Sequence, residues 1–247
     1  MNLETFFKNH NKIALAFSGG TDSSYLLYAA LKYGCDVRPY FVKSAFQPEF
    51  ELDDAKRLCT QLGADLRVIE LDVLADATIA SNPEDRCYYC KRAIFSALIA
   101  AVKADGYSKI MDGTNASDDP GDRPGTRALR ELEVLSPLRE CGITKADIRK
   151  LSQEAGLFTW EKPAYACLAT RIPANTPISD AALKAVENSE DALFKMGFSD
   201  LRVRVIGRTA KIQLPENQLE GALNARADIV AALTKYFDDV TLDLNPR

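Results

Sequence analysis

The stretch Lys12–Ser23, with the sequence KIALAFSGGTDS, decides the fold. Its first part, Lys12–Phe17, is a short apolar run of the length expected for a buried strand. Its second part, SGGTDS, combines two glycines, hydroxyl side chains and one carboxylate, and it leads into a helix predicted over Ser23–Tyr33. A strand, a glycine-containing turn and a helix in this order are typical of an α/β domain that binds phosphate groups.

Each residue type in this loop suits a phosphate ligand. Gly19 and Gly20 let the backbone turn sharply and approach an anion closely, and the N–H groups at the helix start face that anion. Ser18 and Ser23 can donate hydroxyl hydrogen bonds, and Asp22 can hold a Mg²⁺ ion that bridges phosphate oxygens. A serine-capped glycine turn without a ligand is the alternative, but it does not account for the full six-residue pattern. The loop is neither a Walker A loop nor a Rossmann three-glycine turn.

Apolar runs alternate with helical segments over the first half of the chain. Strands are expected at Lys12–Phe17, Val37–Val42, Leu66–Leu71 and Lys109–Met111, and helices at Ser23–Tyr33, Glu49–Leu62, Lys91–Asp105 and from Thr144, where Thr144 and Asp147 resemble a capping box. This alternation predicts an α/β fold, a parallel sheet with helices on both faces. The turn-rich stretch Asp112–Gly125 follows the fourth strand, where open α/β sheets bind their ligands.

The pattern changes after Phe158–Pro177, which contains three prolines, lacks a clear period and is interpreted as a functional loop followed by a linker. A helix is then expected over Asp180–Met196, strands at Leu201–Ile206, Ala210–Leu214 and Val240–Leu244, and one or two helices before Phe237. We therefore predict a phosphate-binding domain over residues 1–177 and a small α+β domain over residues 178–247. The small domain is expected to close the substrate site, to mediate homo-oligomerisation, or both.

Composition limits the classes of function. The chain has 247 residues, 47% of them apolar, and a net charge of −4, which argues against a stable nucleic-acid partner. It has no apolar run of membrane-spanning length and no secretion signal at its N-terminus, so we expect no membrane partner and a cytoplasmic location. Its six cysteines are then expected to be reduced. A single histidine, His10, argues against a histidine base.

The run Cys87-Tyr88-Tyr89-Cys90 is a C-x-x-C motif whose charged flanks, among them Lys91, argue against a dry core. Thiolates at this spacing ligate zinc or iron–sulfur clusters, or form a redox pair. A third cysteine, Cys167, lies in the irregular segment Lys162–Pro173. Three thiolates leave one iron of a four-iron cluster open, whereas a structural cluster usually has four protein ligands. Simple packing is the alternative, and we adopt it for the other cysteines, which are Cys35, Cys59 and Cys141.

The loop SGGTDS resembles that of the pyrophosphatase-loop (PP-loop) superfamily. This resemblance implies that ATP is cleaved between its α and β phosphates, that AMP is placed on a substrate oxygen, and that a nucleophile then displaces AMP. The whole chain further resembles the LarE family, the sulfur transferases that make the nickel-pincer nucleotide of lactate racemase. The segments that carry this resemblance, in order along the chain, are Ser18–Ser23, Asn82–Arg92, Asp112–Asn115, Asp118-Asp119, Gly121–Gly125, Ala166–Pro173 and Arg202–Arg204.

In the LarE family the cysteine that matches Cys167 handles sulfur. Some members lack the C-x-x-C and give up the sulfur of their own cysteine, whereas others carry three cysteines that resemble Cys87, Cys90 and Cys167 and hold a [4Fe-4S] cluster. This chain resembles the second kind. The resemblance therefore implies ATP-dependent transfer of sulfide to a carboxylate of pyridinium-3,5-biscarboxylic acid mononucleotide, with ATP, Mg²⁺ and the cluster as cofactors.

The resulting site prediction has three parts. The expected catalytic residues are Cys167, Asp22 and Lys91. Nucleotide and substrate are expected to contact Ser18, Gly19, Gly20, Asp22, Ser23, Ser44, Gly113, Arg171, Arg202 and Arg204. The expected metal ligands are Cys87, Cys90 and Cys167 for the cluster and Asp22 for Mg²⁺.

Several interpretations stay open at this point. Arg202 and Arg204 alternate with valines, which by itself indicates a half-buried strand with a solvated basic face, whereas the resemblance favours phosphate binding. Polar loop residues (Asp118, Asp119, Asp122) either contact metal or substrate or only populate a loop, and Tyr88 and Tyr89 either stack on a ring or pack. The alternative functions are tRNA thiolation, sacrificial sulfur donation by Cys167, and a nucleotide-binding module without turnover.

Overall fold

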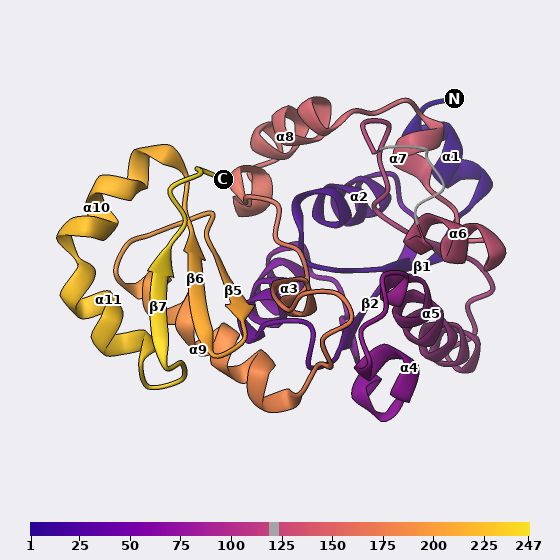
Figure 1. Cartoon of the computed structure of the whole chain (residues 1–247). Helices are drawn as coiled ribbons and strands as arrows, with labels where there is room; N and C mark the ends of the chain where they lie inside the picture. Colours follow the sequence, from indigo (N-terminus) through magenta and orange to yellow (C-terminus); the bar gives the residue numbers. More distant parts are fainter. Residues whose placement is uncertain (119–123) are drawn as a thin grey trace. The chain divides into compact units, whose positions relative to one another are not determined.

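The computed structural model describes residues 1–118 and 124–247, with the side chains of residues 124–126 outside the description (Figure 1). The chain forms two compact units. Unit 1 comprises Met1–Val73 and Asp85–Lys162, and unit 2 comprises Leu74–Glu84 and Pro163–Arg247. Residues 163–177 therefore group with the C-terminal part of the chain, whereas the division based on sequence assigned them to the N-terminal domain.

Unit 1 is built on a four-stranded sheet in the order β3-β2-β1-β4. Its strands are β1 (Lys12–Ala16), β2 (Asp36–Lys43), β3 (Arg67–Glu70) and β4 (Ile110–Met111), and every pair is parallel. The predicted α/β class with a parallel sheet is confirmed. The strand order reverses at β1, which pairs with β2 on one side and with β4 on the other. A crevice at the carboxyl ends of β1 and β4 is where such sheets bind ligands.

Helices cover both faces of this sheet, because successive side chains of a strand point to opposite faces. Ile13 and Leu15 of β1 pack on one face among buried residues of five helices, which are α1 (Leu3–Asn9), α2 (Thr21–Lys32), α3 (Glu49–Leu62), α7 (Pro137–Glu140) and α8 (Lys145–Glu154). Ala14 of β1 and Tyr40 of β2 pack on the other face against α5 (Arg86–Ala104) and α6 (Pro124–Glu131). Burial of these two apolar clusters fixes the end of β1 from which the phosphate loop starts.

Unit 2 contains a three-stranded sheet in the order β5-β6-β7 (Figure 1). Its strands are β5 (Arg202–Ile206), β6 (Thr209–Gln213) and β7 (Asp239–Leu242); β5 and β6 are antiparallel, and β6 and β7 are parallel. Its helices are α4 (Ala77–Ala80), α9 (Asp180–Lys195), α10 (Leu219–Asn224) and α11 (Arg226–Leu233). The predicted small α+β unit is therefore present.

The short segment that contains α4 belongs to unit 2 because Asn82 binds to the chain beyond Cys167. The buried Asn82 amide nitrogen contacts the backbone oxygens of Ile172, Pro173 and Thr176 at 3.4, 2.8 and 3.2 Å. The Asn175 N–H in turn donates to the Asn82 carbonyl at 2.8 Å. Asn82 has a φ of 57°, a left-handed conformation that asparagine tolerates better than most residues. The backbone and amide of Asn82 together hold in place the chain that follows Cys167, from Ile172 to Thr176.

Candidate active site

The loop after β1 has a backbone that only glycine accommodates. Gly19 has a φ of +69°, and a Cβ atom there would lie 3.1 Å from the Glu51 carbonyl oxygen and 3.2 Å from the Ala55 Cβ. Both neighbours belong to α3, which closely covers the turn. Gly20 is the N-cap of α2 and has no side chain over the helix start. No N-cap side chain therefore covers the N-terminal N–H groups of α2.

Hydroxyl groups organise this loop from within. The Ser18 and Ser23 Oγ atoms are 3.1 Å apart, the Ser23 hydroxyl donates to the Gly20 carbonyl at 3.2 Å, and the Gly20 N–H donates to Ser18 Oγ at 3.3 Å. The Thr21 hydroxyl donates to the Thr159 carbonyl at 2.9 Å and joins the loop to a later segment of unit 1. The predicted phosphate-loop residues Ser18, Gly20 and Ser23 thus form one hydrogen-bonded turn.

Two further predicted residues lie at the same edge of the sheet. Gly113 follows β4, and a Cβ atom on it would lie 2.9 Å from the Ser23 nitrogen, so its backbone lies directly against the first turn of α2. Asp112 holds this segment, since its carboxylate accepts hydrogen bonds from Thr114 and Ser136. Ser44 follows β2, is buried, and donates to the Gln47 side-chain oxygen at 2.7 Å. The phosphate loop, Ser44 and Gly113 therefore follow the carboxyl ends of three neighbouring parallel strands, at one end of the sheet.

Asp22 carries an ion pair that the sequence interpretation missed. The Lys145 Nζ atom lies 2.7 and 2.8 Å from the two Asp22 carboxylate oxygens. Burial raises the pKa of Asp22, the hydrogen bond and charge of Lys145 oppose that rise, and the charge of Asp118 adds to it. A carboxylate that already binds a cation through both oxygens fits the chemistry of a Mg²⁺ ligand. The capping box at Thr144 and Asp147 is confirmed, and Lys145 follows that N-cap.

A second lysine supports the loop from another side. Lys162 Nζ donates to Asp54 at 2.6 Å and to the Gly19 carbonyl at 3.3 Å. Arg149 donates to the carbonyls of Trp160 and Lys162 and so fixes the segment that carries Lys162. These residues shape the loop and were not among the predicted site residues. Only the charge of each lysine was visible in the sequence, not its position in space.

The sequence predicted a helix that begins just after the C-x-x-C. In the structure the motif instead lies inside helix α5. Cys87 is exposed and Cys90 is buried, and their spacing of three places them on neighbouring positions of one helix face. The buried Arg86 guanidinium lies 3.7 Å from the Cys87 sulfur and 5.2 Å from the centre of the Phe46 ring. Thiolate ligands with a hydrogen bond to sulfur fit an iron–sulfur cluster.

The other cysteines of unit 1 have ordinary packing roles. Cys35 and Cys59 are buried in the core cluster that contains α1, α2 and α3. Burial raises the pKa of Cys35 to about 11 and that of Cys59 to about 12. Cys141 packs at the edge of the same cluster, and burial also raises its pKa. The predicted packing role of these thiols is confirmed, since protonated thiols are poor ligands and nucleophiles.

Cys167 belongs to unit 2, where a buried ion pair holds its loop. The Arg171 guanidinium donates to Glu190 at 2.8 and 3.0 Å, and both side chains are almost fully buried. Its third nitrogen donates to the carbonyls of Ala166 and Cys167 at 2.6 and 3.2 Å. Burial alone would lower the pKa of Arg171, but hydrogen bonds and charge from Glu190 keep it raised. Arg171 therefore positions the half-buried Cys167 by its backbone.

Arg202 also lies in this network. The prediction that its side chain lies on a solvated face of the strand is wrong. Its side chain is buried, donates to the carbonyls of Leu201 and Ala164 at 2.7 Å each, and lies 4.9 Å from the centre of the Tyr165 ring. Burial and the nearby Arg171 lower the pKa of Arg202 to about 10. Arg204, in contrast, is exposed and donates to Gln213 and to the Thr170 carbonyl. Phosphate binding by either arginine stays a prediction.

The remaining predicted residues belong to unit 1. Lys91 is half-buried on α5 and forms no ion pair with any residue that the structure describes. Tyr88 packs, since its hydroxyl donates to Glu131 at 2.8 Å and the Arg127 guanidinium lies 4.1 Å from its ring centre. The Asp118 carboxylate accepts from the Asn115 N–H at 2.8 Å. The residues outside the description are Asp119 and Asp122, the neighbouring 120, 121 and 123, and the side chains of 124–126.

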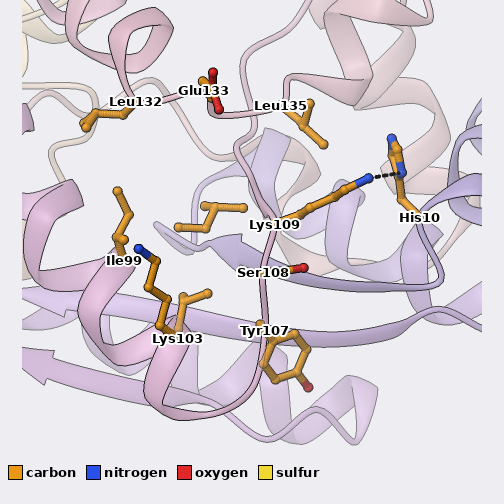
Figure 2. A pocket seen from close by; sticks show the side chains of 11 residues that line it. His10, Ile99, Lys103, Tyr107, Ser108, Lys109, Leu132, Glu133 and Leu135 are labelled. Carbon is orange, nitrogen blue, oxygen red and sulfur yellow. Dashed lines mark hydrogen bonds between the residues drawn. The ribbon is translucent and has the colours of Figure 1, made fainter.

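A cavity of about 510 Å³ lies at the opposite edge of the unit 1 sheet (Figure 2). Its lining includes Lys109 and Ile110 at the amino end of β4 and His10 just before β1. Lys109 reaches toward His10, with Nζ 3.3 Å from Nδ1, as Figure 2 shows. No predicted site residue lines this cavity, and the phosphate loop starts from the other end of β1.

Within either unit, the described residues include no group of three His, Cys, Asp or Glu side chains that could hold a metal ion. Cys87 and Cys90 belong to one unit and Cys167 to the other, so ligation by all three stays a prediction. None of the helices in the described ranges is long and apolar enough to cross a membrane.

The chain is similar over nearly its whole length to several known proteins, two of which are described first. The chain is 34% identical over 240 residues to the pyridinium-3,5-bisthiocarboxylic acid mononucleotide synthase of Lactiplantibacillus plantarum, which covers 96% of this chain and 87% of that protein. It is 33% identical to an uncharacterised protein of Synechocystis, over 98% and 92% of the two chains. A tRNA-specific 2-thiouridylase of Thermotoga petrophila is 24% identical, over 61% and 54%. No family model matches the chain. The extent of the first two similarities shows that the chain belongs to the family of pyridinium-3,5-bisthiocarboxylic acid mononucleotide synthases, the LarE family.

Proposed function

We propose that this enzyme uses ATP to convert a carboxylate of pyridinium-3,5-biscarboxylic acid mononucleotide into a thiocarboxylate. The observation that carries the proposal is the SGGTDS loop at the point where the strand order reverses, with the Gly113 segment against its helix. Such a loop presents N–H groups of a helix start to phosphate oxygens. Membership in the synthase family supports the choice of the pyridinium mononucleotide as substrate.

The chemistry divides into two displacements. In the first, a carboxylate oxygen of the substrate attacks the α-phosphorus of ATP, the bond to the bridging oxygen breaks, and pyrophosphate leaves. In the second, sulfide attacks the carbonyl carbon of the acyl-adenylate, the bond to the AMP oxygen breaks, and AMP leaves. The loop N–H groups hold the phosphates. Asp22 would hold Mg²⁺, which neutralises phosphate charge.

The residues outside the loop are proposed to serve the substrate and the sulfur. Lys91 and Arg204 have partly exposed cationic side chains and would neutralise the mononucleotide anion. Cys87, Cys90 and Cys167 would hold a [4Fe-4S] cluster, which when bound supplies sulfide in deprotonated form. Arg171 and Arg202 are proposed to act on this site through the backbone that they hold around Cys167. Closure by unit 2 and homo-oligomerisation stay predictions.

The proposal is tested by product analysis. Anaerobically purified protein is incubated with ATP, Mg²⁺, the biscarboxylic acid mononucleotide and a sulfide source. We expect AMP and pyrophosphate in equal amounts, with a substrate mass that rises as oxygen is replaced by sulfur. ADP and phosphate as products would contradict the interpretation of the loop. Thiocarboxylate formed without AMP would contradict the adenylate route.

A second candidate function is thiolation of tRNA. The similarity to a tRNA-specific 2-thiouridylase over 61% of the chain favours it, and the net charge of −4 argues against it. The same assay with tRNA in place of the mononucleotide separates the two functions. AMP release that depends on tRNA, together with RNA in the purified protein, would favour the second candidate.

A further inference from the structure

Lys145 stands apart from the other cations near the phosphate loop because its partner is a predicted metal ligand. It is the first residue of α8, and the Thr144–Asp147 capping box fixes the turn that carries it. Its N–H donates to the Ser117 hydroxyl at 3.0 Å. Its ammonium group spans to α2 and contacts both Asp22 oxygens, at 2.7 and 2.8 Å. The backbone of Lys145 is therefore fixed, while its long side chain ends in the site.

Both oxygens of the Asp22 carboxylate are in use. A Mg²⁺ ion takes a carboxylate oxygen as ligand and repels a neighbouring ammonium group. The two side chains keep 33% and 27% of their surface exposed, so a metal ion can reach the pair. Lys145 and a divalent cation therefore compete for Asp22.

The other cationic side chains near the phosphate loop, Lys162 and Arg149, are held by hydrogen bonds to the chain around it. Lys162 donates to Asp54 and Gly19, and Arg149 donates to two backbone carbonyls, so both stabilise the chain around the loop. An ammonium displaced from Asp22 stays beside the first turn of α2, since its backbone is held by the capping box. Lysine binds phosphate oxygens as a mobile point charge.

We infer that Lys145 is a cation relay: it neutralises Asp22 in the nucleotide-free enzyme and transfers to phosphate oxygens when a Mg²⁺–nucleotide takes Asp22. This inference rests on the proposed function, because it requires that the loop bind a Mg²⁺–nucleotide. It makes Lys145 a substrate-contacting residue that the sequence interpretation did not include. It also predicts opposite effects of one substitution on two ligands.

The test uses Lys145→Met, which keeps an unbranched side chain one atom shorter than lysine and removes its charge. A matched control is Lys150→Met, at an exposed position of the same helix. Calorimetry measures Mn²⁺ binding to the nucleotide-free protein and, separately, binding of α,β-methylene-ATP with Mg²⁺, which cannot be cleaved between its α and β phosphates. No turnover is needed for either measurement.

We expect Lys145→Met to bind Mn²⁺ about fivefold more tightly, because a partly exposed ion pair no longer competes. We expect it to bind the nucleotide analogue roughly tenfold to a hundredfold more weakly, because a charged hydrogen bond is lost. Lys150→Met should match the wild type in both. Weaker or unchanged Mn²⁺ binding by Lys145→Met, or unchanged analogue binding, would overturn the inference. Failure of the wild type to bind the analogue would instead overturn the proposed function.

Discussion

Glu190 is the acceptor on which the cysteine loop of unit 2 depends. It accepts hydrogen bonds from Arg171, from the Tyr165 hydroxyl at 2.5 Å and from the Val203 N–H at 2.8 Å. Replacing it with glutamine leaves the buried Arg171 charge without a counter-charge, so we expect the free energy of unfolding to fall by about 3 kcal/mol. Sulfur transfer should fall because the Cys167 backbone loses its support. Denaturant unfolding and product analysis measure the two effects.

The matched control for Glu190→Gln is Asp180→Asn. Asp180 pairs with Lys184 on the surface of α9, with 56% and 68% of their side chains exposed. Surface pairs one turn apart contribute about 0.3–0.5 kcal/mol, so Asp180→Asn should change stability little. Nucleotide binding, which we assign to unit 1, should be normal in both variants. Loss of nucleotide binding in Glu190→Gln would contradict a role confined to the cysteine loop.

Asp22 is predicted to reduce stability at neutral pH. Burial raises its pKa above the ordinary value of 3.8, so the folded protein binds this proton more tightly than the unfolded chain does. Folding therefore becomes less favourable as pH rises from about 3.8 through the raised pKa. We expect Asp22→Asn to unfold at the same or a higher temperature than the wild type at pH 7, with the difference shrinking below pH 4, and to lose Mg²⁺–nucleotide binding.

Asp147 is the control, because its contribution to stability changes with pH in the opposite direction to that of Asp22. Hydrogen bonds from Thr144 lower its pKa, so its contribution to stability is present above the ordinary carboxyl pKa and is lost as pH falls through the lowered one. Asp147→Asn should therefore unfold at a lower temperature than the wild type at pH 7 and approach it in acid. Thermal unfolding across pH 3–7 compares the variants. A clear loss of stability at pH 7 in Asp22→Asn would contradict the raised pKa that we assign to Asp22.

At the scale of elements, contact between the Gly113 segment and α2 makes the phosphate site rigid. Gly113→Ala would place a Cβ atom 2.9 Å from the Ser23 nitrogen, so one element must shift. We expect a loss of about 1–3 kcal/mol in stability and weaker binding of Mg²⁺–nucleotide. Gly221→Ala on α10 is the control, since its Cβ would meet only Phe198 at 3.7 Å. It should gain up to about 1 kcal/mol from helix propensity. Wild-type nucleotide affinity in Gly113→Ala would refute this packing argument.

The sequence predicted elements best where the apolar period was regular. The helix Glu49–Leu62 was predicted with the bounds of α3, and the strand Lys12–Phe17 matches β1 within one residue. Helix α5, in contrast, begins at Arg86 rather than Lys91, because the polar Arg86 and Cys90 supply the first buried positions. Helices α1, α4, α6 and α7 were missed because they are short or lie beside turn-rich sequence.

The chemistry of the site was predictable only where a local motif encodes it. The SGGTDS loop and the C-x-x-C are contiguous in sequence, so their geometry follows from one turn each. The pair between Asp22 and Lys145 joins residues 123 positions apart, and no local pattern indicates it. Arg202 shows the same limit, since alternation in a strand predicts a face but not the Tyr165 ring against the Arg202 guanidinium or the buried Glu190 that binds Tyr165. Long-range ion pairs are set by the fold and not by spacing.

For the whole molecule, the open chemical question is whether the protein survives the reaction unchanged. The phosphate loop, Cys87 and Cys90 belong to unit 1, and Cys167 belongs to unit 2. A donor that sacrifices its own sulfur needs only Cys167 and leaves the other two thiols without a task. A cluster with three protein thiolates needs both units at once. The Arg86 guanidinium donates to the Cys87 sulfur at 3.7 Å, a contact that fits a metal-ligating sulfur.

The last prediction separates these two mechanisms by intact mass and absorbance. If Cys167 gives up its own sulfur, its side chain becomes dehydroalanine. Each molecule then acts once, and its mass falls by about 34 Da, the mass of H₂S. If the three cysteines hold a cluster, the reconstituted enzyme keeps its mass, turns over repeatedly with added sulfide, and absorbs broadly at about 400 nm. Cys90→Ala should then lose both the absorbance and the product, whereas Cys141→Ala, which changes a thiol at the edge of the core, should keep both. Dehydroalanine at position 167 in the active enzyme, or a full single turnover by Cys90→Ala, would establish the sacrificial route instead.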